Sequence, residues 1–167
     1  MEEELYKYID YIKRKHGNQK RKLGNPYYEH PISVANMIRE KGYPIDYQIV
    51  ALLHDTLEDT DATYEEIAKL SNKNIADMVV KLTKEPGYNP EEYLNRILVN
   101  DITRIVKVAD RIHNLRESIM LDDEDFINKY IEESDQFLYL LAEGTVFEEE
   151  FLEAVEAVKH KANKKSL

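Results

Sequence analysis

Residues 51–60 read ALLHDTLEDT, and this stretch is the strongest indication of the fold and of the chemistry that we expect of the chain. An apolar run leads into His54 and Asp55, and two more acids, Glu58 and Asp59, follow about one helical turn later. Residues four apart share a helix face, so we expect His54 over Glu58 and Asp55 over Asp59. Unpaired charge is costly to bury, and a divalent metal ion would compensate it. The alternative is an exposed acidic turn in a protein that is acidic throughout.

The composition fits one globular domain, residues 1–167, with 43% hydrophobic residues and enough chain for a sizeable core. There is no cysteine, so neither disulfides nor thiolate metal sites are available. Any metal must therefore bind imidazole and oxygen ligands. These ligands suit a divalent ion such as manganese, iron, zinc or magnesium.

The net charge of −10 argues against binding to DNA or RNA, because phosphate backbones are bound by an excess of lysine and arginine. A small phosphorylated ligand could still bind the local cluster Lys20-Arg21-Lys22, which lies on an expected loop. The alternative is that this loop is merely solvated. The N-terminus is acidic and no apolar run approaches membrane-spanning length, so we expect a cytoplasmic protein without a membrane contact.

Helical periodicity recurs along the chain, and no useful length alternates with a period of two. The expected helix starts are Asp46, a capping box at Thr63, and Asn74, Asn89 and Asp101. The helix that starts at Asp46 is expected to run through residues 54–55 and onward. The sequence therefore predicts an all-α fold, a compact bundle of about eight helices.

Candidate metal ligands lie on three separate expected helices. His30 precedes a proline that suits a helix start, His54 and Asp55 lie in mid-helix, and Asp110 borders the apolar stripe of a long helix. Two imidazoles and two carboxylates could hold one octahedral divalent ion with positions left for water and substrate. The alternatives are that His30 only caps its helix, and that Asp110 forms an ion pair with a neighbouring Lys107 or Arg111.

Three motifs in this order resemble the HD superfamily of metal-dependent phosphohydrolases. Residues 16–31 read HGNQKRKLGNPYYEHP, residues 52–60 read LLHDTLEDT and residues 107–116 read KVADRIHNLR. Within the superfamily they are most similar to the hydrolase domain of RelA/SpoT proteins and to the single-domain small alarmone hydrolases. The similarity extends over roughly residues 11–117 and implies the HD-domain fold.

The resemblance implies a role for each matching residue. Glu58 and Asp59 would orient and deprotonate the attacking water, Arg21 and Lys22 would meet the nucleotide, and Asn114 would shape the site. The reaction that the resemblance implies removes the 3′-pyrophosphate of ppGpp or pppGpp, leaving GDP or GTP. The implied ligands of the metal ion, which is manganese in the family, are His30, His54, Asp55 and Asp110.

Three positions differ from the family pattern. Leu23 stands where a small hydroxyl residue is usual, Asn25 where an acid is usual, and Glu117 where threonine is frequent. These positions lie near the nucleotide end of the family's site, so they bear on base recognition more than on hydrolysis. No synthetase-like segment follows within these residues, so a chain that acts on alarmones is expected only to degrade them.

Two other functions remain open from the sequence. One is an HD phosphohydrolase with the same metal site that acts on another nucleotide, such as a nucleoside phosphate or NADPH. The other is a non-catalytic nucleotide-binding module. The second is disfavoured because Glu58, Asp59 and all four candidate ligands are present.

Overall fold

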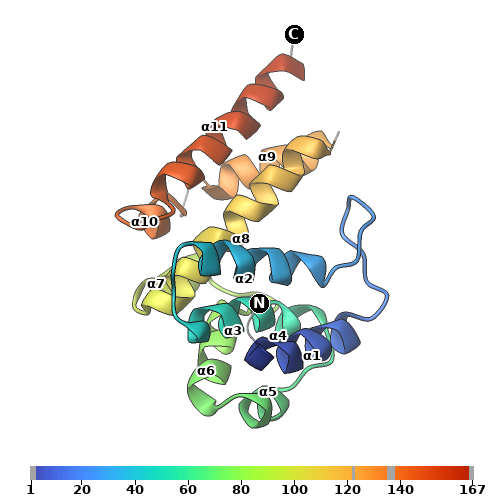
Figure 1. The fold of residues 1–167 in the computed structure, drawn as a ribbon. Coiled ribbons are helices and arrows are strands. Elements are labelled where there is room, and N and C mark those ends of the chain that lie inside the picture. Colours follow the sequence, from blue (N-terminus) through green and yellow to red (C-terminus); the bar gives the residue numbers. More distant parts are fainter. Residues whose placement is uncertain (1–2, 122, 135–137, 166–167) are drawn as a thin grey trace.

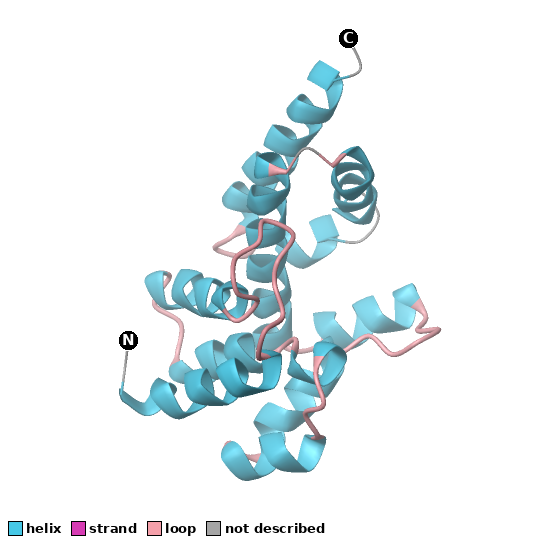
Figure 2. Cartoon of the chain, turned by 90° about the vertical axis from the view of Figure 1, so that its right-hand side faces the viewer, coloured by secondary structure: helices cyan, strands magenta, loops and turns pink. Residues whose placement is uncertain are grey.

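The computed structural model describes residues 3–121, 123–134 and 138–165, and these residues form helices joined by loops. The all-α prediction is confirmed: the described part of the chain contains one isolated β-bridge, between Lys20 and Pro26, and no longer strand (Figure 2). The elements are η1 Glu3–Leu5, α1 Tyr6–His16, α2 Glu29–Glu40, α3 Ile45–Leu53, α4 Thr56–Asp59, α5 Tyr64–Leu70, α6 Lys73–Leu82, α7 Pro90–Leu98, α8 Asp101–Met120, α9 Glu124–Glu133, α10 Tyr139–Ala142 and α11 Glu148–Lys165.

Helix α8 is the central element of the fold. Asn100 caps it by accepting a hydrogen bond from Thr103 N, and its inner face buries Ile105, Ile112 and Leu115. Helices α2, α3, α6 and α7 pack against it, as do α9, α10 and α11. The early helices gather at one end of the molecule and α9–α11 at the other (Figure 1). Side chains of α8 are therefore held rigidly between the two ends.

Helix starts were predicted with mixed success. Thr63 and Asn89 cap their helices as expected, and Thr63 forms the full capping box. The assignment of Asp46 as a cap was wrong, because α3 begins after Pro44, whose extended backbone already sets the turn. The start at Asn74 was also wrong: Asn72 accepts the bond from Ile75 N and caps α6.

The helix expected to continue through residues 54–55 is broken there. Helix α3 ends at Leu53, and α4 begins again at Thr56. The His54 imidazole bonds to the Ala51 carbonyl at 2.6 Å, and the Thr56 hydroxyl bonds to the Leu53 carbonyl at 2.7 Å. These side chains satisfy carbonyl groups at the helix end, so the chain can turn without leaving buried polar groups unpaired.

The described helices include none that is both long and apolar enough to cross a lipid bilayer.

Removing a core ring from α11 should destabilise the whole fold. Phe151 is fully buried, and its ring meets that of Tyr139 edge-on at 5.4 Å. We expect Phe151→Ala to lower the free energy of unfolding by about 3–5 kcal/mol, and hence to lower Tm by roughly 6–20 °C in a thermal melt. Leu152→Ala is the matched control, because that neighbouring side chain is 40% exposed. Equal effects of the two changes would contradict this packing.

Candidate active site

Four of the sequence-predicted residues meet in one buried cluster. His30 lies in the first turn of α2, His54 and Asp55 in the break between α3 and α4, and Asp110 in the middle of α8. The Nε2 atom of His30 lies 3.1 Å from Asp110 Oδ1 and 3.6 Å from Asp55 Oδ2. The Nε2 atom of His54 lies 3.1 Å from Asp55 Oδ1 and 3.7 Å from Asp110 Oδ1. The fold thus brings together the four candidate ligand residues, which come from three separate parts of the sequence.

The cluster fits a divalent metal ion. Adjacent ligands of an octahedral ion with bonds of about 2.1 Å are roughly 3 Å apart, close to the separations seen here. The His54 Nδ1 must donate to the Ala51 carbonyl, so a neutral His54 presents the lone pair of Nε2 to a metal ion. Burial lowers the pKa of His54, but without an ion the neighbouring Asp55 and Asp110 outweigh burial and raise it. That Nε2 atom is buried and has no hydrogen-bond partner within the described chain. Two nitrogens and two carboxylates form a donor set suited to a divalent ion.

Outer contacts orient the cluster. Asp110 Oδ2 accepts from Lys107 Nζ at 2.9 Å, and Asp110 Oδ1 accepts from Asn114 Nδ2 at 2.7 Å. The Nδ1 atoms of His30 and His113 lie 2.9 Å apart. Such supporting partners fix the orientation of metal ligands and raise their affinity.

The two carboxylates of the cluster are ionised. Burial alone would raise the pKa of Asp55, but the neighbouring His54 and His30 hold it below its ordinary value. Burial opposes ionisation of Asp110 as well, and Lys107 with the two histidines holds its pKa far below the usual range. Both side chains are therefore in the charged form that binds a cation.

Glu58 and Asp59 form a second acidic group with Asp55, in which one carboxylate oxygen from each lies within 4.8 Å of the others. Glu58 Oε1 accepts from the backbone N of Lys84 at 2.7 Å. The Tyr27 hydroxyl lies 2.7 Å from Asp59 Oδ2 and 2.9 Å from Asp55 Oδ2, so it bridges these two carboxylates. Burial raises the pKa of Glu58 and of Asp59. A raised pKa makes a carboxylate a better proton acceptor.

The three predicted substrate-binding residues differ in their placement. Arg21 Nη2 donates to Asn114 Oδ1 at 2.6 Å, and Arg21 Nε donates to Glu117 Oε2 at 2.9 Å, so both predicted residues adjoin the cluster. Lys22 instead pairs with Asp123 at 2.7 Å on the outer surface of the molecule. Arg21 and Asn114 can therefore reach a ligand at the cluster, while Lys22 lies further out.

Cations that were not assigned to the site also line it, among them Lys84, Lys107 and Arg111. On α8, Lys107 lies three residues before Asp110 and Arg111 lies one residue after it. The sequence could therefore have predicted both cations near the site. The predicted Lys107–Asp110 ion pair is present, but Arg111 pairs with Glu133 instead. Lys84 follows α6 and reaches the site through tertiary folding, for which the sequence holds no local signal.

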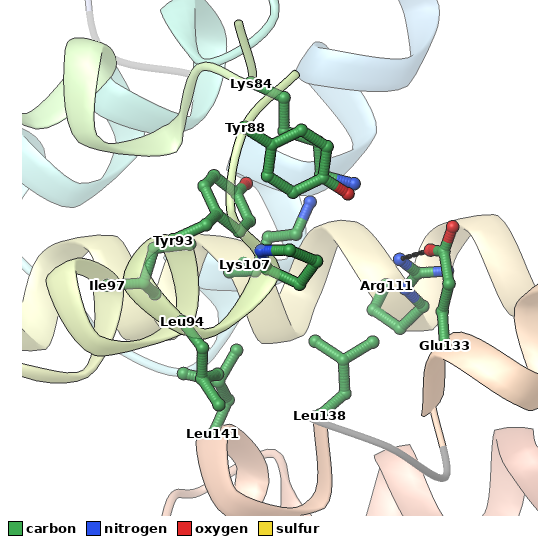
Figure 3. Close-up of a pocket in the computed structure, with 11 residues that line it drawn as sticks. Lys84, Tyr88, Tyr93, Leu94, Ile97, Lys107, Arg111, Glu133, Leu138 and Leu141 are labelled. Atoms are coloured by element: carbon green, nitrogen blue, oxygen red, sulfur yellow. Dashed lines mark hydrogen bonds and ion pairs between the residues drawn. The ribbon is translucent and has the colours of Figure 1, made fainter. Parts of the chain in front are cut away.

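These cations also border an adjoining cavity of about 150 Å³ (Figure 3). Its remaining wall is mostly apolar and includes Tyr93 and Leu138. Arg111 is buried, and its Nε and Nη1 have no hydrogen-bond partner among the described residues. Burial and the nearby Lys107 lower the pKa of Lys84. Guanidinium N–H groups without a partner and crowded amines are stabilised by an anion, and phosphate oxygens are typical partners.

Comparison with known proteins shows the family to which the chain belongs. Residues 9–88 match the HD domain family model. The MESH1 guanosine-3′,5′-bis(diphosphate) 3′-pyrophosphohydrolase of Danio rerio is 34% identical over 123 residues, which cover 68% of this chain and 68% of that protein. The chain belongs to the HD-domain family, and within it to the group that contains MESH1. Membership of this family implies a divalent metal, in agreement with the cluster.

Two further similarities concern a longer relative and a solved structure. A guanosine-3′,5′-bis(diphosphate) 3′-pyrophosphohydrolase of Aquifex aeolicus is 40% identical over 122 residues, which are 68% of this chain but only 18% of that longer protein. The solved structure of a metazoan ortholog of SpoT that hydrolyses ppGpp matches with a TM-score of 0.80. That match covers 93% of this chain and 96% of the other at 21% identity, and it shows a common fold.

A divalent ion should stabilise the folded protein. Only the folded chain brings the cluster together, so an ion that binds there binds the native state and adds to the free energy of unfolding by mass action. At an ion concentration of 100 times Kd, the free energy of unfolding rises by about 2.7 kcal/mol, so Tm should rise by roughly 5–10 °C. A thermal melt of chelated protein with and without MnCl₂ measures this shift. His54→Ala protein should not respond, and an equal shift in that variant would place the ion elsewhere.

Proposed function

We propose that this chain hydrolyses the 3′-pyrophosphate of guanosine tetra- and pentaphosphate, giving GDP or GTP and pyrophosphate. One observation carries the proposal: one site is lined by residues of the metal cluster, by an acidic pair and by cations that include Lys84, Lys107 and Arg111. An acidic pair beside a metal site suits hydrolysis, and the cations suit a polyphosphate substrate. The relatives from Danio rerio and Aquifex aeolicus carry the name of this reaction. We further propose that the enzyme is cytoplasmic.

We infer that His30, His54, Asp55 and Asp110 bind the ion, which we propose to be manganese. A bound divalent ion lowers the pKa of water and compensates the charge of a phosphate oxygen. Glu58 is placed to accept the proton of the attacking water. The Tyr27 hydroxyl holds Asp59, which would orient that water. As the water oxygen bonds to phosphorus, the bond from phosphorus to the 3′ oxygen of the ribose breaks. The water oxygen leaves with pyrophosphate, and the 3′ oxygen takes up a proton, so that GDP or GTP carries a 3′ hydroxyl.

The charges around the cluster orient the proposed substrate. Lys84 and Arg111 line the site, where they suit the substrate phosphates. An adjoining cavity of about 160 Å³ has the aromatic rings of Tyr27, Phe126 and Tyr130 in its wall. Flat aromatic walls suit a nucleobase. Arg21 lines both regions and would lie between base and phosphates.

The test is release of pyrophosphate from ppGpp by purified protein with manganese. We expect conversion to GDP that stops after chelation and in Asp59→Ala protein. A protein that binds the ion but leaves ppGpp intact would refute the proposed substrate. Activity on NADPH or on a nucleoside phosphate in the same assay would then identify the other HD phosphohydrolase function. Nucleotide binding without any turnover would identify the non-catalytic alternative.

A further inference from the structure

The cavity beside the metal cluster contains an acid in its wall. Glu117 is the one carboxylate among the described residues that line it, and its side chain is only 12% exposed. It projects from α8, seven residues after Asp110 and therefore about two turns along the same helix. A buried carboxylate in a cavity for an anionic substrate needs a reason, because like charges repel.

The cations of this cavity are largely neutralised. Arg21 forms an ion pair with Glu117, and Lys22 forms one with Asp123. At the metal cluster itself, no acid of the described chain pairs with the Lys84 amine within 4.0 Å. Arg111 forms an ion pair with Glu133 through Nη2, but its Nε and Nη1 atoms have no hydrogen-bond partner among the described residues. The charge distribution therefore favours phosphates beside Lys84 and Arg111, and the uncharged base beside Glu117.

Glu117 has hydrogen-bonding capacity left. Its Oε2 accepts from Arg21 Nε at 2.9 Å and also from Arg21 Nη2. Its Oε1 lies 4.0 Å from His113 Nδ1 and accepts no hydrogen bond from the residues that the structure describes. An ionised carboxylate only accepts hydrogen bonds, so a ligand edge that faces it must offer donors.

Guanine offers two adjacent donors, N1–H and the N2 amine. Hypoxanthine keeps N1–H but lacks the amine, and adenine presents an acceptor at N1, which a carboxylate repels. We propose that Glu117 is a specificity-determining residue that selects guanine by accepting hydrogen bonds from this edge, while Arg21 holds the carboxylate in place. This inference rests on the proposed function, since it takes the base to lie in this cavity.

The test compares three substrates that differ only in the base: the 3′,5′-bis(diphosphates) of guanosine, inosine and adenosine. For wild-type protein with manganese, kcat/KM should favour guanosine over inosine by about 10-fold or more, as expected for a paired contact to a base edge. In Glu117→Gln protein this ratio should fall towards 1. Glutamine keeps an oxygen for Arg21, but its amide N–H groups oppose the guanine donors.

Asp123→Asn is the matched control. It removes an acid from the neighbouring Lys22, and asparagine can still cap α9 in place of Asp123. The guanosine-to-inosine ratio should remain at the wild-type value. If Glu117 only positioned Arg21, Glu117→Gln would lower kcat/KM for all three bases by the same factor. That result, or a wild-type enzyme without base preference, would overturn the inference.

A binding measurement separates this inference from the proposed function. If the wild-type protein hydrolyses none of the three substrates, the proposed reaction is wrong, and calorimetry with GDP and IDP then decides the role of Glu117. Tighter binding of GDP than of IDP, lost in Glu117→Gln protein, would support guanine selection without any turnover. Equal affinities for GDP and IDP would overturn it.

Discussion

Asp110→Asn protein is expected to lose hydrolysis and to bind a divalent ion far more weakly than the wild type. Asp110 Oδ1 lies within 3.1 Å of one cluster imidazole and 3.7 Å of the other, so it is central to the proposed ligand set. Loss of a mere supporting partner weakens metal binding by roughly 10- to 100-fold. Loss of a ligand should weaken metal binding by a larger factor. Calorimetric titration with MnCl₂ measures the affinity, and pyrophosphate release measures the activity.

The control for this change is Asp101→Asn at the start of the same helix. Asp101 is exposed and accepts a hydrogen bond from the Tyr47 hydroxyl, far from the cluster. The Asp101→Asn change should leave the affinity for the ion and the hydrolytic activity unchanged. A thermal melt of Asp110→Asn protein checks folding, since Lys107 loses its partner there. An Asp110→Asn protein that binds the ion normally and remains active would exclude Asp110 as a ligand.

The fold class was predictable because helical periodicity and local capping signals extend over most of the chain. Thr63 and Asn89 were found because their bonds lie within one helical turn. Asn72 was missed because two asparagines two residues apart offer the same chemistry, and tertiary packing chooses between them. The bundle contains more helices than the expected eight, because α4 and α10 have four residues each and show no periodicity.

The site residues that belong to a sequence motif were predictable, and those that reach the site only through tertiary packing were less so. The convergence of His30, His54 and Asp110 follows from the motifs, but the helix break at His54 depends on side-chain bonds to carbonyl groups. Lys84 has no motif and reaches the site because the loop after α6 folds over α4. Arg21 was expected, with Lys22, to meet the nucleotide, and its hydrogen bond to Glu117 was not predicted. Such pairings between distant residues are invisible to local patterns.

Glu58→Gln protein is expected to keep the metal and to lose most of kcat. Glu58 lies outside the four-residue cluster, and its raised pKa fits a group that accepts a proton. Removal of a general base typically costs about 10²- to 10⁴-fold in rate. Because the amide oxygen of the new glutamine can still accept from the backbone N of Lys84, the loop after α6 should stay in place. Steady-state kinetics should therefore show a lower kcat with KM little changed.

Comparison with Asp59→Asn protein tells which acid takes the proton. Burial raises the pKa of both acids, and a hydrogen bond opposes this rise in each: the Tyr27 hydroxyl donates to Asp59, and the backbone N of Lys84 donates to Glu58. In the proposed roles, Asp59 orients the water and Glu58 takes its proton. Asparagine can still accept the bond from Tyr27, so Asp59→Asn should cost less in kcat than Glu58→Gln. The exposed Glu85, one residue after Lys84, supplies the control Glu85→Gln, which should have wild-type kcat. A larger loss in Asp59→Asn would make Asp59 the base, and an unchanged kcat in Glu58→Gln would remove Glu58 from the mechanism.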